Sequence, residues 1–416
     1  MKRVLSLILT CSLGLSLFSG CTSASAKELT APKLSVNPSN SEEVNAALAS
    51  FGLELLQKTR EDGDTSVLVS PLSVALALSM AANGADGSTL AQFQDVLGGG
   101  VDLVELNGAC AQLMADYQNL NGSTKCTIAN SLWVDPDGQI KDEFVGKCLG
   151  VFDAQVFAAE LSNPGIVTEL NGWVSKYTNK LIPKIISEPF DDETACLLVN
   201  ALYLKNKWLK EFDPLCTGES EFQHGDGSAT RVEFMSHQNT SLSYLQGEGA
   251  KGVVLPYDDG RLAFFALLPD VYTDTAYLSF EDWLNTLEGN SLSGLVNSRE
   301  DTLFLCLALP KFEAEWSGHL ENILPALGLE DAFDPGAANF ANLGDYELGY
   351  YISQVVHAAK LEVNEKGTEA AAATVVAANG SGMPPQEGVT LIFDRPFLYG
   401  IVDLYTGVPL FLGTCE

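Results

Sequence analysis

The stretch GTEAAAATVVAANGSGMPPQEG, residues 367–388, contains no Arg, Lys or aromatic residue and lies between two apolar runs. Loops of more than about 15 residues are uncommon inside a compact domain and are usually functional or disordered. Alternate side chains from Thr368 to Ala378 are small to medium-sized, and in a β-strand they would share one face. Glu369 and Ala371, which begin the other face, are acceptable at a surface. The pattern indicates a loop that can become a buried strand of a crowded sheet; an exposed linker is the alternative.

Short apolar runs that are typical of buried strands surround this stretch. Runs with apolar residues on both faces belong in the middle of a packed layer. They are CLLVNALYL (196–204), GVVLPY (252–257), LAFFALLP (262–269), LFLCLALP (303–310), YYISQVV (350–356), FLYGIV (397–402) and VPLFL (408–412). Because helical patterns lie early, strands dominate late and no repeat of roughly 20 to 50 residues is visible, we expect one large α+β domain.

Two helices are predicted near the start of the folded body. Asn40 and Glu43 can form a capping box, and apolar residues then recur at helical spacing over residues 44–55. A second helix is expected to begin at Ser70–Pro71, where a hydroxyl can cap the first turn and Pro fits its first position. This helix should end near residues 83–84, an Asn-Gly pair.

The first residues have the order of a secretory signal. Lys2 and Arg3 precede the apolar stretch 4–18, which is too short to span a bilayer as a permanent helix. Small residues at 19–20 then stand before Cys21. This arrangement resembles the bacterial lipoprotein cleavage box, in which the cysteine becomes the lipidated first residue of the mature chain.

These features predict a division of the chain into three parts. Residues 1–20 would be a lipoprotein-type signal peptide, and residues 21–40, rich in small polar residues and Pro, a flexible tether. The folded body would cover residues 41–416. The mature protein would then be extracellular or on the cell surface, lipid-anchored to a bacterial membrane through Cys21. A plain signal peptide with an incidental cysteine is the alternative.

Charge and side-chain chemistry exclude several classes of protein. Against 54 Asp and Glu stand only 23 Lys and Arg, a formal charge of -31, so nucleic acid and anionic lipid surfaces would repel the chain. The nine cysteines form no CxxC pair, and the four histidines are scattered. We therefore expect no metal site and no cofactor. An enzyme is not expected either, since no GxSxG, HExxH or phosphate-binding loop is present.

Several segments together resemble the serpin family. LIFDRPFLYGI (391–401) is similar to the family's C-terminal signature, and EVNEKGTEAAAAT (362–374) to the hinge of its inhibitory reactive loop. LVSPLSVALALSMAANGADGSTLAQF (68–93) resembles the early helix, and LVNALYLKNKWLKEFDP (198–214) follows in the family's order. The resemblance implies a single α+β domain in which helices surround a large central mixed sheet. A reactive loop at about 365–390 would be exposed.

The resemblance also implies a mechanism in which the loop is bait. A serine protease cleaves a peptide bond of the loop and forms an ester to the loop in its place. The freed hinge then enters the main sheet and traps the protease before the ester is hydrolysed; serpin loop insertion is a known case of strand addition. The hinge residues would be Glu365, Gly367, Thr368, Glu369, Ala370, Ala371, Ala372, Ala373 and Thr374. Ser70, Ser73, Asn200 and His357 look like the polar shutter beneath the sheet, and Trp208 like the residue at the top, where insertion begins.

The reactive bond follows from the spacing in inhibitory members of the family. Counting 17 residues from Glu365 ends at Ser381, which places the bond between Ser381 and Gly382. The bonds after Gly380 and Ala378 are alternatives. Since no cation or large aromatic residue lies nearby, a narrow, elastase-like protease pocket fits best.

The partner implied is therefore a serine protease, bound covalently by a monomer that touches a membrane only through a lipid at Cys21. Two other functions remain open. A serpin fold can serve as a non-inhibitory carrier or structural partner, because a fold does not determine a function. A solute-binding lipoprotein is a more remote alternative, since that architecture needs two lobes of alternating strands and helices.

Overall fold

The computed structural model describes residues 26–61, 66–192, 194–270, 278–289, 291–368 and 388–416. The predicted signal peptide, Cys21, the hinge residues after Thr368 and the predicted reactive bond lie outside these ranges. The hinge up to Thr368, the four predicted shutter residues and Trp208 lie within them.

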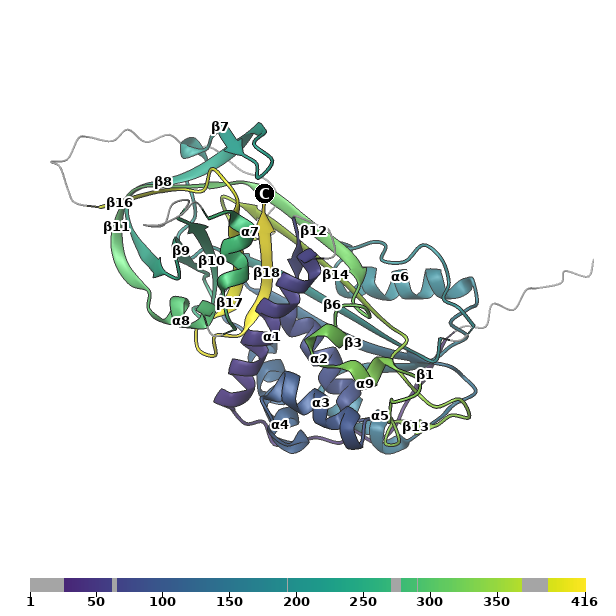
Figure 1. Ribbon diagram of the computed structural model, residues 1–416. Helices are drawn as coiled ribbons and strands as arrows, with labels where there is room; N and C mark the ends of the chain where they lie inside the picture. The colour runs from purple at the N-terminus through teal and green to yellow at the C-terminus, as the bar shows by residue number, and fades with distance from the viewer. Residues whose placement is uncertain (1–25, 62–65, 193, 271–277, 290, 369–387) are drawn as a thin grey trace, which may run out of the picture.

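The described chain forms an α+β fold in which most helices come from its first half (Figure 1). The helices are α1 Glu42–Glu61, α2 Pro71–Ala82, α3 Gly87–Gly98, α4 Leu103–Gln118, α5 Asp142–Val151, α6 Gly165–Tyr177, α7 Phe280–Thr286, α8 Ser291–Asn297 and α9 Glu330–Phe333, with 3-10 turns at Pro214–Cys216 and Pro325–Leu327. Two large sheets and a largely separate set of helices are thus present in one chain, so the predicted α+β class is confirmed.

A seven-stranded mixed sheet is the centre of the fold. Its order is β1 (Lys27–Leu29), β5 (Gln155–Ala158), β3 (Lys125–Val134), β6 (Cys196–Lys207), β15 (Gly367–Thr368), β14 (Gln354–Asn364) and β12 (Phe312–His319). On its outer face α6 packs against apolar side chains of β3 and β6, including Ala129, Val199 and Ala201. On its inner face the wholly buried α2 packs against β6 and β3. Covered on both faces, the strands can read as continuous apolar runs.

The second sheet has nine strands. Along its main path lie β16 (Val389–Ile392), β11 (Glu300–Pro310), β8 (Ala229–Gly247), β9 (Ala250–Pro256), β10 (Leu262–Pro269), β17 (Phe397–Asp403), β18 (Pro409–Cys415) and β2 (Leu68–Val69), while β7 (Gly218–Gln223) pairs with β8. A small third sheet joins β4 (Gln139–Ile140) to β13 (Gly344–Asp345). Every residue of β10 and β17 is buried, which explains their unbroken apolar runs.

Six of the seven predicted strands are present, and each of their ends lies within three residues of the predicted end. The exception is the run 350–356, because the strand begins only at Gln354 and continues to Asn364. Tyr350 and Ile352 are buried without being in a strand, so their apolar character reflects packing in the core. An apolar run alone does not distinguish these two kinds of burial.

The two predicted helices are present, but neither predicted cap is correct. Helix α1 begins after Ser41, whose hydroxyl accepts a hydrogen bond from the backbone N–H of Val44 at 3.3 Å, whereas Asn40 is exposed. Ser70 makes no side-chain cap on α2. Its hydroxyl instead donates to the backbone oxygen of Leu410 in β18 at 2.8 Å. Tertiary contacts therefore outweigh the local capping preference here.

The predicted flexible tether differs from the structure over its second part. Residues 27–29 form edge strand β1, whose register pairs Lys27 with Ala158. Further along, the N–H groups of Leu34 and Ser39 donate to the backbone oxygens of Gly146 and Gly108 at 2.9 and 3.0 Å. Small polar composition did not reveal this docking, because backbone hydrogen bonds at a sheet edge need no particular side chain.

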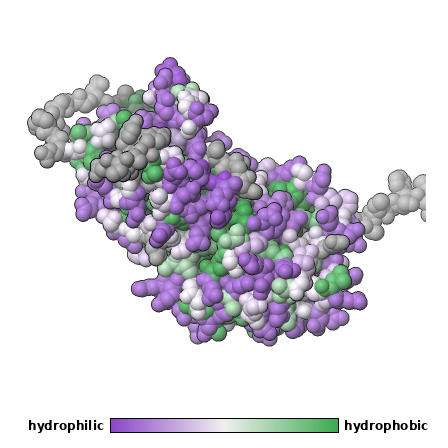
Figure 2. All heavy atoms as spheres, in the orientation of Figure 1, coloured by the Kyte–Doolittle hydropathy of each residue, from purple (hydrophilic) through white to green (hydrophobic). Residues whose placement is uncertain are grey.

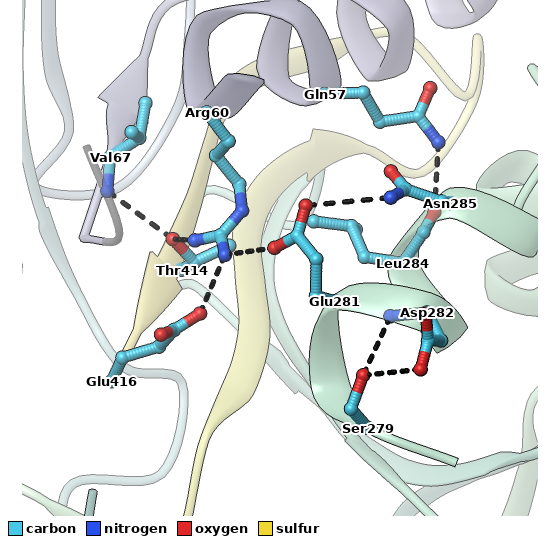
Figure 3. Close-up of polar contacts among 10 residues, drawn as sticks. All are labelled: Gln57, Arg60, Val67, Ser279, Glu281, Asp282, Leu284, Asn285, Thr414 and Glu416. Atoms are coloured by element: carbon cyan, nitrogen blue, oxygen red, sulfur yellow. Dashed lines mark hydrogen bonds and ion pairs between the residues drawn. The ribbon is translucent and has the colours of Figure 1, made fainter. Parts of the chain in front are cut away.

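Arg60 joins the end of α1 to the end of the described chain (Figure 3). Its side chain is 4% exposed, and its guanidinium donates to Thr414 at 2.9 Å and forms ion pairs with Glu416 at 2.7 Å and with Glu281 of α7. Gln57 donates to the backbone oxygen of Leu284 at 2.8 Å, which also ties α1 to α7. A buried guanidinium needs such multiple partners because an unpaired buried charge is strongly destabilising.

Hydrophilic residues predominate on the face of the molecule shown in Figure 2, in keeping with the strongly negative composition. Within the described ranges, no helix combines the length and apolar character needed to cross a membrane.

Candidate functional site at the open end of the central sheet

The short strand β15 lies between β6 and β14 at one end of the central sheet. Thr368 pairs with Asn206 of β6 on one side and with Val363 of β14 on the other, both antiparallel. At the opposite end β6 and β14 pair directly and in parallel, over residues 197–199 and 354–356. In the described part of the chain, β6 and β14 are therefore separated by β15 at one end of the sheet and paired directly at the other.

Gly367 permits this close approach of three backbones. Its φ of +148° belongs to the region that favours glycine. A β-carbon at this position would lie 2.0 Å from the backbone oxygen of Asn206, which no side chain could tolerate. The glycine is thus required by the sheet itself.

Thr368 is already inside the sheet. It is 0% exposed and shares the inner face with Asn206 and Val363, as the predicted alternation of the loop requires. The resemblance led us to expect an exposed loop whose hinge, with Gly367 and Thr368 in it, enters the sheet only after cleavage. That expectation is wrong for Gly367 and Thr368, because the tight turn after β14 carries them directly back between the two strands.

Glu365 fastens this turn to segments that flank β7 and β11 of the second sheet. Its carboxylate accepts a hydrogen bond from the Thr217 hydroxyl at 2.9 Å and pairs with Lys311 at 3.2 Å, and its backbone oxygen accepts from the N–H of Phe212 at 2.9 Å. Partial burial raises the pKa of the Glu365 carboxyl, but hydrogen bonds to its charged form outweigh burial and leave the pKa below its ordinary value. The carboxylate is therefore held ionised at neutral pH.

Trp208 connects the end of β6 to the same turn. Its backbone N–H donates to the oxygen of Lys366 at 3.0 Å, and its indole N–H to the oxygen of Asn364 at 2.8 Å. The ring is 3% exposed and stacks on Tyr257, with centroids 4.9 Å apart and planes 6° from parallel. The structure thus places Trp208 at the open end of the sheet, beside β15.

His357 and Ser70 meet beneath the middle of the sheet. The backbone N–H of Ser70 donates to Nε2 of His357 at 3.0 Å, so Nε2 is unprotonated. The imidazole is 1% exposed, and burial lowers its pKa to about 4. Nδ1 carries the proton of the neutral ring, and it has no hydrogen-bond partner among the described residues.

The other two predicted shutter residues are buried in the same layer but are not bonded to this pair. Asn200 donates from Nδ2 to Oδ1 of Asn130 on the neighbouring strand β3. Within the described ranges, Oδ1 of Asn200 and the hydroxyl of Ser73 have no partner. Buried polar atoms without partners are destabilising unless another group can satisfy them. The four side chains therefore form a polar layer with unused hydrogen-bonding capacity.

A second polar network at the open end was missed in the sequence. Asn206 donates to Asp259 at 2.6 Å, and Thr124 donates to Asp259 at 2.9 Å. Asp259 also accepts from the backbone N–H groups of Arg261 and Leu262 at 2.6 and 2.7 Å. Asn206 could have been found, because it lies at an inward position of the strand that holds Asn200. Asp259 comes from a distant turn, and nothing local in the sequence connects the two.

A metal ion would need a cluster of side chains that could bind it. Across the parts of the chain that the structure describes, no group of three or more His, Cys, Asp or Glu could hold a metal ion.

Comparisons with known proteins agree with this geometry. A family model described as "Serpin (serine protease inhibitor)" matches residues 46–416. A putative serpin-Z5 of Oryza sativa subsp. japonica is 30% identical over 399 residues, which cover 88% of each chain.

Solved structures show the same fold. The thermophilic serpin tengpin in its native state is 32% identical, with a TM-score of 0.84 over 94% of this chain and 98% of that one. In its latent state the TM-score is 0.76, over 91% and 99%. A complex of thyroxine-binding globulin with thyroxine has a TM-score of 0.77 at 23% identity, over 90% and 98%, and shares the fold alone. With the family model covering most of its length, the chain belongs to the serpin family, whose members include serine protease inhibitors.

Proposed function

We propose that this chain is a suicide-substrate inhibitor of serine proteases that traps its target by inserting its cleaved loop into the central sheet. The position of β15 carries the proposal. Gly367 and Thr368 already lie between β6 and β14, where an inserted loop would have to continue.

The length of β6 supports insertion. If the register of Thr368 with Asn206 continued, residues 369 to 378 would pair with residues 205 to 196 in turn. Residue 196 is the first residue of β6, so β6 could pair with the loop as far as residue 378, just before the predicted reactive bond. The direct pairing of 197–199 with 354–356 would have to part for the last of these residues.

The polar layer beneath the sheet supports the same reading. In the continued register Thr374 would lie opposite Asn200, on the inward face. Its hydroxyl could then use the hydrogen-bonding capacity that Asn200, Ser73 and His357 leave unused in the described structure. Insertion would thus satisfy polar groups that are now buried without partners, and this gain adds to the new backbone ladder.

We propose an elastase-like protease as the target. Ser381 offers only a hydroxymethyl group to the specificity pocket, which a narrow pocket accepts, whereas a trypsin-like pocket gains no ion pair. We further propose that residues 1–20 direct export and that Cys21 carries a lipid, so that inhibition takes place at the cell surface.

A panel of serine proteases tests the function directly. After incubation and denaturing electrophoresis, an elastase-type enzyme should give a covalent band at the summed mass. Mass spectrometry of the released C-terminal peptide should show a new N-terminus at Gly382. Complete cleavage without a covalent band, for every protease that cuts the loop, would refute the inhibitor and favour the non-inhibitory carrier.

A further inference from the structure

A cleft lies beside β13, at the end of the molecule away from β7 (Figure 1). One wall is the turn after β3, residues 135–139, and the other is the segment 338–350, which leads to β14 at the closed end of the central sheet. The pairing of β4 with β13 holds the two walls together, with Asp345 opposite Gln139. The cleft has a volume of about 530 Å³, which is within the usual range for small-molecule sites.

Three exposed carboxylates line this cleft. Among the described residues, the carboxylates of Asp137, Asp345 and Glu347 form no ion pair and accept no hydrogen bond. The side chains that line the cleft include no Lys, Arg or His. Lys141 is close by, but its ammonium donates to the backbone oxygen of Ala341 at 2.6 Å. The cleft therefore presents negative charge that no ion pair offsets, and it would attract a cation.

Two tyrosines supply an aromatic surface in the same cleft. The rings of Tyr346 and Tyr350 are stacked, with centroids 5.0 Å apart and planes 24° from parallel. Tyr350 is 5% exposed, whereas Tyr346 is half-buried and keeps part of its ring open to the cleft. The face of an aromatic ring attracts a cation placed over it. The aromatic surface and the carboxylates thus favour the same kind of ligand.

The hydroxyl of Tyr350 is a buried polar group without a partner. No described residue forms a hydrogen bond with it. The hydroxyl lies against Gly138, where a β-carbon would overlap it, between Asp137 and Gln139, which both line the cleft. Burial raises the pKa of Tyr350, so the hydroxyl stays neutral and can accept a hydrogen bond from a cationic N–H group. Buried polar groups without partners are uncommon in proteins, so this one indicates a ligand.

The arrangement of these groups suits an organic cation better than a metal ion. Within the described ranges, no group of three or more His, Cys, Asp or Glu could hold a metal ion, so the three carboxylates do not converge on one point. A guanidinium or a chain with ammonium groups carries several N–H donors and can reach carboxylates that lie apart. Phe340, which is 5% exposed, and Ala338 also line the cleft and can pack against the carbon chain of such a cation.

We propose that this cleft binds an organic cation that carries N–H donors, such as a guanidinium or a primary ammonium on a short carbon chain. The carboxylates of Asp137, Asp345 and Glu347 would attract the charge, the ring of Tyr346 would pack against it, and the hydroxyl of Tyr350 would accept one N–H. A free amine and a side chain of a basic peptide share this chemistry. The site goes beyond the proposed inhibition, which would begin at the opposite end of the central sheet.

Isothermal titration with agmatine, which has a guanidinium and an ammonium on a four-carbon chain, tests the site. The wild type should bind agmatine but not 1,4-butanediol, an uncharged analogue of the chain, and added salt should weaken the binding. Asp345→Asn and Glu347→Gln should each weaken it about two- to fivefold, the range for an exposed charge pair. Glu219→Gln, which removes an exposed carboxylate from β7, is the matched control and should leave the affinity unchanged.

The same titration distinguishes the two sources of the cation. Tighter binding of a diarginine peptide than of agmatine would identify a basic segment of a partner protein, and the reverse would identify a free amine; either result supports the site. No saturable binding of agmatine or of the peptide, or an equal loss in Glu219→Gln and the two cleft variants, would overturn it.

Tyr350→Phe provides an independent measurement. Because the hydroxyl has no partner among the described residues, its removal should leave the thermal midpoint of the free protein unchanged or raise it. The same variant should bind agmatine about tenfold more weakly, as expected for a lost hydrogen bond to a charged group. Tetramethylammonium, which has no N–H group, should bind the wild type and the variant equally. Unchanged affinity for agmatine in Tyr350→Phe would overturn the role of the hydroxyl.

Discussion

Replacing Thr368 by Arg tests whether the strand begun by β15 is the one that traps the protease. Thr368 is 0% exposed, between Asn206 and Val363 and on the inner face of the sheet. A guanidinium there would have no acidic partner on the neighbouring strands, because the residues opposite it are Asn206 and Val363. An uncompensated buried charge costs about 3 to 5 kcal/mol.

The alternative for the variant is to withdraw β15 from the sheet. Only two residues form β15, and each of their backbone hydrogen bonds contributes about 1 kcal/mol. Withdrawal therefore costs no more than burying the charge, and we expect Thr368→Arg to fold with the hinge outside the sheet. Insertion past this position would then carry at least about 3 kcal/mol of extra barrier, which slows it on the order of a hundredfold.

The assay is the stoichiometry of covalent complex with a protease that the wild type traps. Thr368→Arg should be cleaved at the same bond and released as a substrate, whereas Thr368→Val, which keeps the shape of the side chain, should still trap. Wild-type stoichiometry in Thr368→Arg would refute the assigned path of the loop. Loss of trapping in both variants would show that the site is sensitive to any change and not to charge.

Three further outcomes are expected. Cleavage of the loop between Ala378 and Gly382 by a protease that is not trapped should raise the midpoint of thermal unfolding, since the freed strand can complete the sheet; a flat or falling midpoint would favour the non-inhibitory carrier. Lowering the pH from 7 to 5 should destabilise the native state by about 2 kcal/mol through His357 alone. The pKa of His357 in the folded protein, about 4, lies below its unfolded value of about 6.5, so the unfolded chain takes up the proton first. The thermal midpoint of His357→Asn should fall less than that of the wild type over this pH range, and an equal fall would contradict the role of His357. Lys311→Met and Glu365→Gln should each lower the thermal midpoint, and the double variant should lose less than the sum of the two, whereas strict additivity would show that this ion pair, partly exposed on the Lys311 side, contributes nothing.

The fold could be predicted from the sequence because its signals are local and repeated. The fully buried runs of β10 and β17 predict central strands without any knowledge of their neighbours. The inward parity of Thr368 also followed from the alternation of small side chains alone. Such patterns are dictated by burial, which acts on each element separately.

Features that depend on a distant partner could not be predicted. The choice of Ser41 over Asn40 as a cap, one residue apart, and the use of the Ser70 hydroxyl by β18 are decided by tertiary packing. Lys125 and Lys205 stand opposite each other only because β3 and β6 pair in one register. The position of Gly367 and Thr368 inside the sheet likewise depends on the distance between β6 and β14, which cannot be predicted from any single segment of the sequence.

Under the proposed mechanism, the presence of β15 changes which step limits insertion of the cleaved loop. A free strand joining a sheet must first search for its alignment, and ordering the backbone before the ladder forms makes that nucleus unfavourable. Here the nucleus exists beforehand, and a slip of one residue would turn Thr368 outward and bring a charged neighbour inward. After cleavage the proposed mechanism then requires only elongation, in which each residue joins the sheet beside one already bound. In the proposed mechanism, hydrolysis of the ester then competes with the separation of residues 197–199 from residues 354–356 at the closed end.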